Sequence, residues 1–370
     1  MLTWLLLMTL FLAYTNGAND NFKGVATLFG SRTTTYHTAL WWATAATCAG
    51  SCAAIYFSGG LVKAFSGKGL VPDALIQQPA FLLCVGLSAA LTVLLATLTG
   101  FPISTTHAIT GALVGAGLVE AGAVNLGKLG QVFFLPLIVS PFLSFALAGL
   151  LYPAFRWARA RLGVERHMCL CLDGGAAEAV DLRPDGTAVM RATGMSLTVG
   201  QLSACVARYD GAVFGLDAQW ILDRLHYLSA GAVSFARGLN DTPKIVALLV
   251  AATGLGLSLS SGMFAVGIAM GLGGLLNARK VALTMSEGIT TMNHGQGFTA
   301  NLVTACLVTT ASRFGLPVST THVSCGSLFG IGTVGGQARW PMIRNIILSW
   351  LITLPVAGAC AAGLARLLRV

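Results

Sequence analysis

The sequence predicts an all-α, polytopic membrane protein with two repeats of inverted topology. Each repeat should contain discontinuous or re-entrant helices, and a small soluble insert should separate the two halves. Three observations lead to this prediction. Of the 370 residues, 55% are hydrophobic and 9% are charged, a balance that excludes an ordinary soluble enzyme. Apolar stretches of membrane-spanning length recur along the chain, and two polar motifs each occur twice in the same order.

The apolar stretches come in two lengths. A spanning helix needs about 20 residues, and the stretches that reach or approach this length are 39–57, 80–98, 132–152, 244–259, 299–311 with its flanks, and 346–364. Residues 2–14 reach only about 20 Å of a hydrocarbon core of about 30 Å, so we expect this helix to stop halfway. Segments 103–119 and 318–334 are also short and glycine-rich. We expect all three to be half-helices or re-entrant hairpins.

Residues 156–223 break this pattern and predict the soluble insert. The stretch from Arg156 to Arg224 holds eight arginines and eight acidic residues, and Pro184-Asp185-Gly186 is a turn signal. Arginines follow directly after a membrane segment here, which places the insert on the cytoplasmic side by the positive-inside rule. The predicted domains are an N-terminal membrane repeat (1–155), a cytoplasmic soluble linker (156–223) and a C-terminal membrane repeat (224–370).

The charges outside this stretch indicate an anionic partner. They comprise 14 Lys/Arg and 5 Asp/Glu and give the whole net charge of +9, which suits anionic lipid headgroups and an anionic cargo. Nucleic acid is excluded, because no basic cluster with interleaved aromatic residues occurs.

Six of the nine cysteines lie in apolar runs and no Cys-x-x-Cys occurs, so a disulfide scaffold is not expected. Cys169 and Cys171, beside His167, lack the usual zinc spacing.

Two duplicated motifs give the strongest internal evidence for repeats. Asn19-Asp20-Asn21-Phe22-Lys23 returns as Asn240-Asp241-Thr242-Pro243-Lys244, and Pro102-Ile-Ser-Thr-Thr-His107 returns as Pro317-Val-Ser-Thr-Thr-His322. The aspartate and the serine are 84 positions apart in the first half and 78 in the second. Paired hydrophobic halves that are interrupted at matching positions point to a secondary transporter with its site at the repeat interface.

The Asn-Asp motif predicts a cation site. Asp20 and Asp241 are two of only five acids outside the stretch 156–224, and a carboxylate at membrane depth is a functional hypothesis by default. We expect each at the end of a short helix, where free carbonyls carry partial negative charge. Such oxygen ligands suit sodium or a proton. The predicted cation ligands are Asn19, Asp20, Asn240 and Asp241. Alternatively, Asn-Asp caps the next helix, with Lys23 or Lys244 as its ion partner.

The Pro-x-Ser-Thr-Thr-His motif predicts an oxyanion site. Proline sets the first helical turn, so helices should begin near Ser104 and Ser319 with free N–H groups. These groups, together with hydroxyls and the positive end of the helix dipole, bind an anion without a buried arginine. The alternative is a helix cap with a small-residue packing face. For His107 and His322 we expect packing or a backbone hydrogen bond, while a role in sensing charge stays open.

These motifs, with Asn277-Ala-Arg-Lys280 and Met292-Asn-His-Gly-Gln-Gly-Phe298, resemble the inorganic phosphate transporter (PiT) family. The resemblance covers both membrane halves and leaves out the linker. It implies an inverted-repeat fold and symport of inorganic phosphate with sodium or protons. The phosphate site would then comprise Ser104, Thr105, Thr106, Ser319, Thr320, Thr321, Asp20 and Asp241. Thr242-Pro243 replaces Asn21-Phe22 in the second copy, which weakens the exact equivalence beyond Asn-Asp, so Asn21 is not carried over as a site residue.

Other functions fit the sequence less well. A lipid phosphatase would need an arginine-histidine cluster or a metal triad, and an anion channel has no use for paired carboxylates that bind a driving cation. We therefore expect no enzyme and no covalent cofactor, with Na⁺ or H⁺ as coupling ion. A sulfate permease of the same fold is the alternative. We expect a multi-pass protein of a cell membrane, most simply a prokaryotic inner membrane. Its partners would include the membrane lipid. A homodimer, the ion stoichiometry and the role of the linker stay open.

Overall fold

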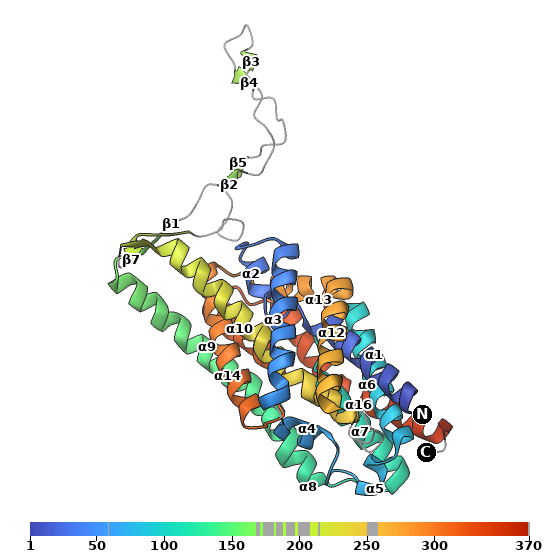
Figure 1. Ribbon diagram of the computed structural model, residues 1–370. Coiled ribbons are helices and arrows are strands. Elements are labelled where there is room, and N and C mark those ends of the chain that lie inside the picture. Colours follow the sequence, from blue (N-terminus) through green and yellow to red (C-terminus); the bar gives the residue numbers. More distant parts are fainter. Residues whose placement is uncertain are drawn as a thin grey trace. The chain divides into compact units, whose positions relative to one another are not determined.

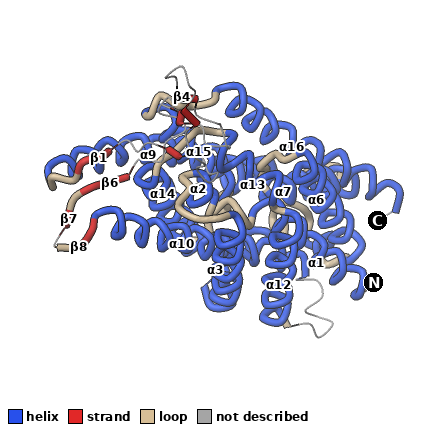
Figure 2. The backbone as a smooth tube through the Cα atoms, turned by 90° about the horizontal axis from the view of Figure 1, so that it is seen from above, coloured by secondary structure: helices blue, strands red, loops and turns tan. Residues whose placement is uncertain are grey.

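The computed structural model describes residues 1–57, 59–167, 171–172, 181–182, 188–189, 197–198, 208–213, 215–249 and 258–368. They form two compact units. One consists of Met1–Phe155 and Leu222–Val370, and the other is Arg156–Ile221. The first unit is helical, whereas the described strands all lie in the second (Figures 1 and 2).

The N-terminal half of the helical unit begins with a long helix and continues with both long and short helices. Its elements are α1 Leu2–Asp20, α2 Ala26–Gly30, α3 Tyr36–Phe57, α4 Gly59–Phe65, α5 Asp73–Ile76, α6 Pro79–Thr99, α7 Thr105–Ala121, α8 Leu126–Lys128, the π-helical turn η1 Leu129–Phe134 and α9 Leu135–Arg161.

The C-terminal half follows a similar order. Its elements are α10 Ala218–Val246, the 3₁₀ turn η2 Ala247–Leu249, α12 Leu259–Asn277, α13 Arg279–Leu283, the π-helical turn η3 Thr284–Gly288, α14 His294–Arg313, α15 Thr320–Val334 and α16 Trp340–Leu368.

The second unit contains short antiparallel strand pairs. These are β1 Glu165–His167 with β6 Arg208–Asp210, β2 Cys171–Leu172 with β5 Leu197–Thr198, β3 Asp181–Leu182 with β4 Ala188–Val189, and β7 Ala212–Val213 with β8 Leu216–Asp217. Cys169, one of the two cysteines considered above as zinc ligands, lies outside the described residues.

Several helices can cross a membrane. In the described part of the chain, four helical segments are long and apolar enough: α6, the run Leu126–Arg161 that ends with α9, α12 and α16. The bent pair α3 and α4 is a fifth if it is taken as one span. Helices α1, α10 and α14 have similar lengths but carry more polar residues. The prediction of a helical, polytopic membrane protein is confirmed.

Two predicted helix boundaries are wrong. Helix α1 does not stop at residue 14 but continues through Asn16 and Asn19 to Asp20. The predicted span 244–259 does not exist as such, because Lys244 lies inside α10, which runs through Pro243 and ends at Val246. Residues 250–257 of that span lie outside the described residues. In both places, polar side chains find hydrogen-bond partners on other helices, so the helix need not end where its apolar run ends.

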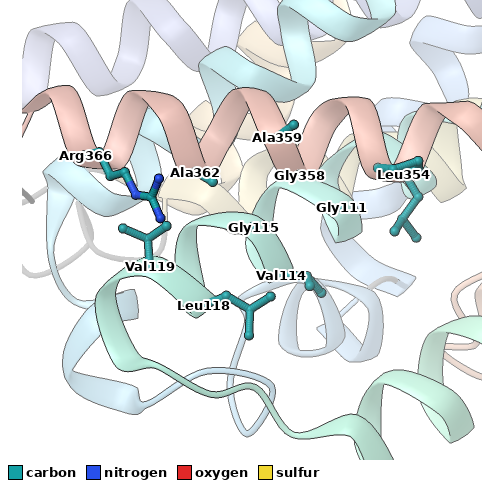
Figure 3. A pocket seen from close by; sticks show the side chains of 11 residues that line it. Gly111, Val114, Gly115, Leu118, Val119, Leu354, Gly358, Ala359, Ala362 and Arg366 are labelled. Carbon is teal, nitrogen blue, oxygen red and sulfur yellow. The ribbon is translucent and has the colours of Figure 1, made fainter.

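Helices of one half pack against helices of the other. Helix α1 lies against α12 as well as α6, and α7 lies against α16. Figure 3 shows the α7–α16 contact, where Gly111 and Gly115 face Leu354 and Gly358 beside a groove of about 480 Å³ with Arg366 at one end. In the second half, α15 makes the matching contact with α9, since Gly326 meets the carbonyl of Pro141.

Two glycines set the distance between the halves near the Asn-Asp motifs. A Cβ on Gly17 of α1 would lie 1.9 Å from the carbonyl oxygen of Met270, and a Cβ on Gly238 of α10 would lie 2.2 Å from that of Thr47. No side chain fits at either position without moving a backbone. Glycine therefore lets α1 approach α12 and α10 approach α3 closely.

We expect Gly17→Ala to lower the free energy of unfolding by about 1–3 kcal/mol, because the added methyl forces α1 and α12 apart. The melting temperature in detergent measures this loss. Gly363→Ala in α16 is the matched control, since its Cβ would meet nothing within 4 Å. Equal melting temperatures for both variants would contradict the close-packing account.

Candidate functional site

Five charged side chains are buried, and they lie together. Asp20, Lys23, Arg237, Asp241 and Lys244 are each at most 3% exposed. Among the described residues, these are the buried members of the Asp, Glu, Lys and Arg types. They come from α1, from α10 and from the turn that follows α1. We call them the charged cluster.

The ammonium group of Lys23 is surrounded by oxygen atoms. Its Nζ donates to the side-chain oxygen of Asn19 at 2.9 Å, to the backbone oxygen of Ile103 at 3.0 Å and to the hydroxyl of Thr321 at 2.6 Å. It also forms an ion pair with Asp20. The predicted alternative, in which lysine is the ion partner of this aspartate, describes this contact correctly.

Lys244 repeats this arrangement in the second half. Its Nζ lies 3.2 Å from the Asp241 carboxylate and donates to the backbone oxygen of Val318 at 2.7 Å and to the hydroxyl of Thr106 at 3.0 Å. Ile103 and Val318 precede the two predicted serines, so the equivalent lysines contact equivalent positions. Each lysine takes its hydroxyl from the opposite half of the chain.

The Ser-Thr-Thr motifs start two helices as predicted. Ser104 is the N-cap of α7 and Ser319 is the N-cap of α15, and each hydroxyl accepts a hydrogen bond of 3.2 Å from the backbone N–H of the histidine three residues later. Both serines have the extended backbone that precedes a helix. The caps leave first-turn N–H groups without an acceptor inside their helix.

The two helix starts face each other across the cluster. Thr321 donates to the backbone oxygen of Ile103 at 2.8 Å, and Thr106 donates to that of Val318 at 3.4 Å. The N-termini of α7 and α15 are therefore neighbours. The positive ends of both helix dipoles then act on the same small volume.

Asn16 and Arg237 connect the two halves. They stand 221 positions apart, the same offset that relates Asp20 to Asp241. Arg237 Nη2 donates to Asn16 Oδ1 at 2.8 Å, while Asn16 Nδ2 donates to Thr105 at 2.9 Å and to Asp20 at 3.1 Å. The same Nδ2 lies 3.5 Å from Asp241, and Thr320 donates to Asp241 at 3.5 Å.

One donor in this network is free. Arg237 Nε has no hydrogen-bond partner among the described residues, and the nearest carboxylate oxygen, on Asp241, lies 3.7 Å away. Its Nη1 donates both to Asn21 Oδ1 at 3.0 Å and to the hydroxyl of Thr47 at 3.2 Å. A buried guanidinium N–H without an acceptor is a place for an anionic oxygen.

The amide of Asn19 connects α1 to α6, and the amide of Asn240 connects α10 to α14. Asn19 Nδ2 donates to Thr97 at 3.0 Å, and its Oδ1 accepts from the N–H of Ile103 at 3.1 Å as well as from Lys23. Asn240 Oδ1 accepts from Ser312 at 3.2 Å, and its Nδ2 donates to Val318 O at 3.3 Å. Their predicted role as cation ligands stays a prediction.

The histidines at the end of the motifs pack together. The rings of His107 and His322 are 4.6 Å apart, and the His322 ring lies 4.0 Å from that of Trp350. His322 Nδ1 is also 3.2 Å from the backbone oxygen of Leu137. The structure agrees with the expected packing and backbone contact.

The sequence prediction did not include the buried arginine. It described an anion site without arginine, whereas Arg237 is a member of the cluster, with its Nε 3.7 Å from the Asp241 carboxylate. The signal was present in the chain, because Arg237 lies four residues before Asp241 and at the position equivalent to Asn16. With all five groups ionised, three positive and two negative charges leave the cluster at +1. The arrangement therefore favours one negative charge.

Comparison with known proteins shows the family. A family model described as the phosphate transporter family matches residues 16–361. The chain belongs to the phosphate transporter family. The resemblance drawn from the motifs is confirmed, and the family consists of transporters rather than enzymes.

This chain is similar to some relatives over nearly their whole length and to others over part of it. A protein of Pyrococcus abyssi named as a candidate phosphate permease is 29% identical over 99% of this chain and 98% of its own. The sodium-dependent phosphate transporter 2 of Xenopus tropicalis is 36% identical, over 39% of this chain and 24% of its own. A solved structure titled the sodium-dependent phosphate transporter has a TM-score of 0.76, with 22% identity, over 100% of this chain and 98% of that one. That likeness shows a shared fold.

Proposed function

We propose that this family member is a symporter that moves inorganic phosphate across the membrane on a sodium or proton gradient. The charged cluster, with the N-termini of α7 and α15, is its phosphate site. The observation that carries this proposal is a buried cluster of three basic and two acidic side chains, in which Arg237 Nε has no hydrogen-bond partner among the described residues, beside two helix N-termini. A monoanion that enters this volume neutralises the cluster and gains donors that already point at it.

The charge of the cluster favours phosphate over sulfate. The monoanion H₂PO₄⁻ brings the cluster to zero, whereas sulfate, a dianion, leaves an uncompensated negative charge. H₂PO₄⁻ also carries O–H groups that can donate to Asp20 or Asp241, while sulfate has none and would meet these carboxylates with repulsion. Sulfate transport is therefore the second candidate.

Uptake into proteoliposomes that contain the purified protein tests this assignment. Labelled phosphate should accumulate, and the rate should fall with unlabelled phosphate but hardly with the same concentration of sulfate. Acidification from pH 8 to pH 6 should lower the apparent KM for total phosphate, because the fraction present as the monoanion H₂PO₄⁻ rises. Equal competition by sulfate would contradict the assignment and favour a sulfate permease.

We expect Thr320→Val to weaken phosphate affinity by about 1.5–3 kcal/mol, or about 10- to 150-fold, if its hydroxyl donates to the bound anion. A neutral hydrogen bond would account for about 0.5–1.5 kcal/mol. Phosphate binding to the purified protein measures the change. Thr333→Val, at the exposed end of the same helix, is the control. An unchanged affinity in Thr320→Val would remove this hydroxyl from the site.

We further propose that the two halves are inverted in the membrane, with the linker on the cytoplasmic side of a prokaryotic inner membrane. In that case Ala121 and Val334, the last residues of α7 and α15, face opposite sides. Single cysteines there, in a variant whose nine native cysteines are alanine, should react with an impermeant maleimide from opposite sides. Reaction of both from the same side would contradict the inversion.

A further inference from the structure

The surroundings of the two buried lysines are those of a metal-cation site. All partners of Lys23 Nζ are oxygen atoms, one each from a carboxylate, a side-chain amide, a backbone carbonyl and a hydroxyl. Lys244 Nζ has a carboxylate, a backbone carbonyl and a hydroxyl. Carboxylate, carbonyl and hydroxyl oxygens are the ligands that hard cations such as Na⁺ take. We call these two sets of oxygens the cages.

Each cage already holds a cation that is attached to the chain. Lys23 and Lys244 each follow their aspartate by three residues, so the ammonium group reaches the carboxylate within the same turn of the chain. Both side chains are buried. A sodium ion that entered either cage would meet an ammonium group at contact distance and compete for the same oxygens.

The net charge of the cluster also argues against a bound metal cation. With both ammonium groups in place, the cluster carries +1 and one monoanion neutralises it. Two additional sodium ions would raise the buried charge to +3, and a monovalent phosphate would leave +2 uncompensated. The described cluster is therefore complete for a monoanion without a metal cation.

We propose that the ammonium groups of Lys23 and Lys244 replace the metal cation in two equivalent cages, so that this chain carries phosphate without sodium. This inference rests on the proposed function, and of its two coupling ions it selects the proton. The charged and titratable groups that face the two lysines are Asp20, Asp241, Arg237, Cys325 and His322. They belong to α1, α10 and α15.

The first experiment uses the unmodified protein. Phosphate uptake into proteoliposomes is measured under a fixed proton gradient, with either sodium chloride or choline chloride outside. We expect rates that agree within about twofold. A fall of about tenfold or more in choline would overturn the inference and assign the coupling to sodium.

The second experiment opens the cages. Lys23→Ala and Lys244→Ala each remove one ammonium group and leave its oxygens free, so Na⁺ should now bind and raise the melting temperature of the variant by at least about 2 °C relative to choline. The unmodified protein and Lys63→Ala, whose lysine is exposed, should show no such shift. A sodium-dependent shift in the unmodified protein, or none in either folded cage variant, would contradict the inference.

The two experiments separate this inference from the proposed function. Absence of phosphate uptake under every cation condition would overturn the symporter proposal. The melting temperatures would still decide what the cages bind, because they do not depend on transport. If the alanine variants do not fold, the comparison of sodium with choline in the unmodified protein decides alone.

Discussion

Asp20→Asn and Asp241→Asn will each abolish driven phosphate uptake, to the rate of liposomes without protein. Each change removes the carboxylate that balances a fully buried ammonium group, Lys23 or Lys244. Breaking one partner of a buried ion pair typically costs about 3–5 kcal/mol. It also raises the charge of the cluster from +1 to +2. Uptake in proteoliposomes, normalised to the amount of folded protein, measures the loss.

A matched control and a paired variant separate transport from folding. Asp73→Asn changes an exposed aspartate and should leave uptake unchanged. Asp20→Asn combined with Lys23→Met removes both charges of one pair, so it should recover much of the lost melting temperature but no uptake. Near-normal uptake in either single variant would return that aspartate to a purely structural role.

Arg237→Met will have the second large effect. It takes the cluster from +1 to zero and removes a buried guanidinium N–H that has no hydrogen-bond partner among the described residues. If that donor binds the anion, phosphate affinity should fall by about 1.5–3 kcal/mol, or about 10- to 150-fold, for this charged hydrogen bond alone. Arg237→Lys keeps the charge but loses the fork that holds Asn16 and Asn21, so it should recover only part of the affinity.

Phosphate binding to the purified variants measures this effect. Arg279→Met, at an exposed position on α13, is the control for loss of an arginine. Wild-type affinity in Arg237→Met would show that the guanidinium only connects α10 to α1, as its contacts with Asn16 and Asn21 permit.

The sequence predicts the helix starts well because their cause is local. Proline fixes the geometry of the preceding and following residues, so the starts of α7 and α15 follow directly from Pro102 and Pro317. The duplication of Asn-Asp and Ser-Thr-Thr also points to four segments whose side chains the fold brings within hydrogen-bond distance. These features depend on spacing along the chain.

The helix ends near the cluster depend on contacts that the sequence does not display. Asn16 and Asn19 indicate the end of an apolar helix, yet α1 continues because Thr105 and Thr97 accept their hydrogen bonds. Asp20 is the last residue of α1, as expected, whereas Asp241 lies inside α10 together with Arg237 and Lys244. The pairing of each lysine with a hydroxyl of the other half is a tertiary contact. It therefore appears only in the structure.

The proposed symporter drives phosphate across a membrane against its gradient. The most direct measurement is the concentration of labelled phosphate inside proteoliposomes under an imposed cation gradient, followed by addition of an ionophore that collapses that gradient. We expect accumulation above the external concentration and release of the accumulated phosphate after the ionophore is added. Entry that stops at the external concentration and does not respond to the ionophore would contradict it, because that is the behaviour of a channel.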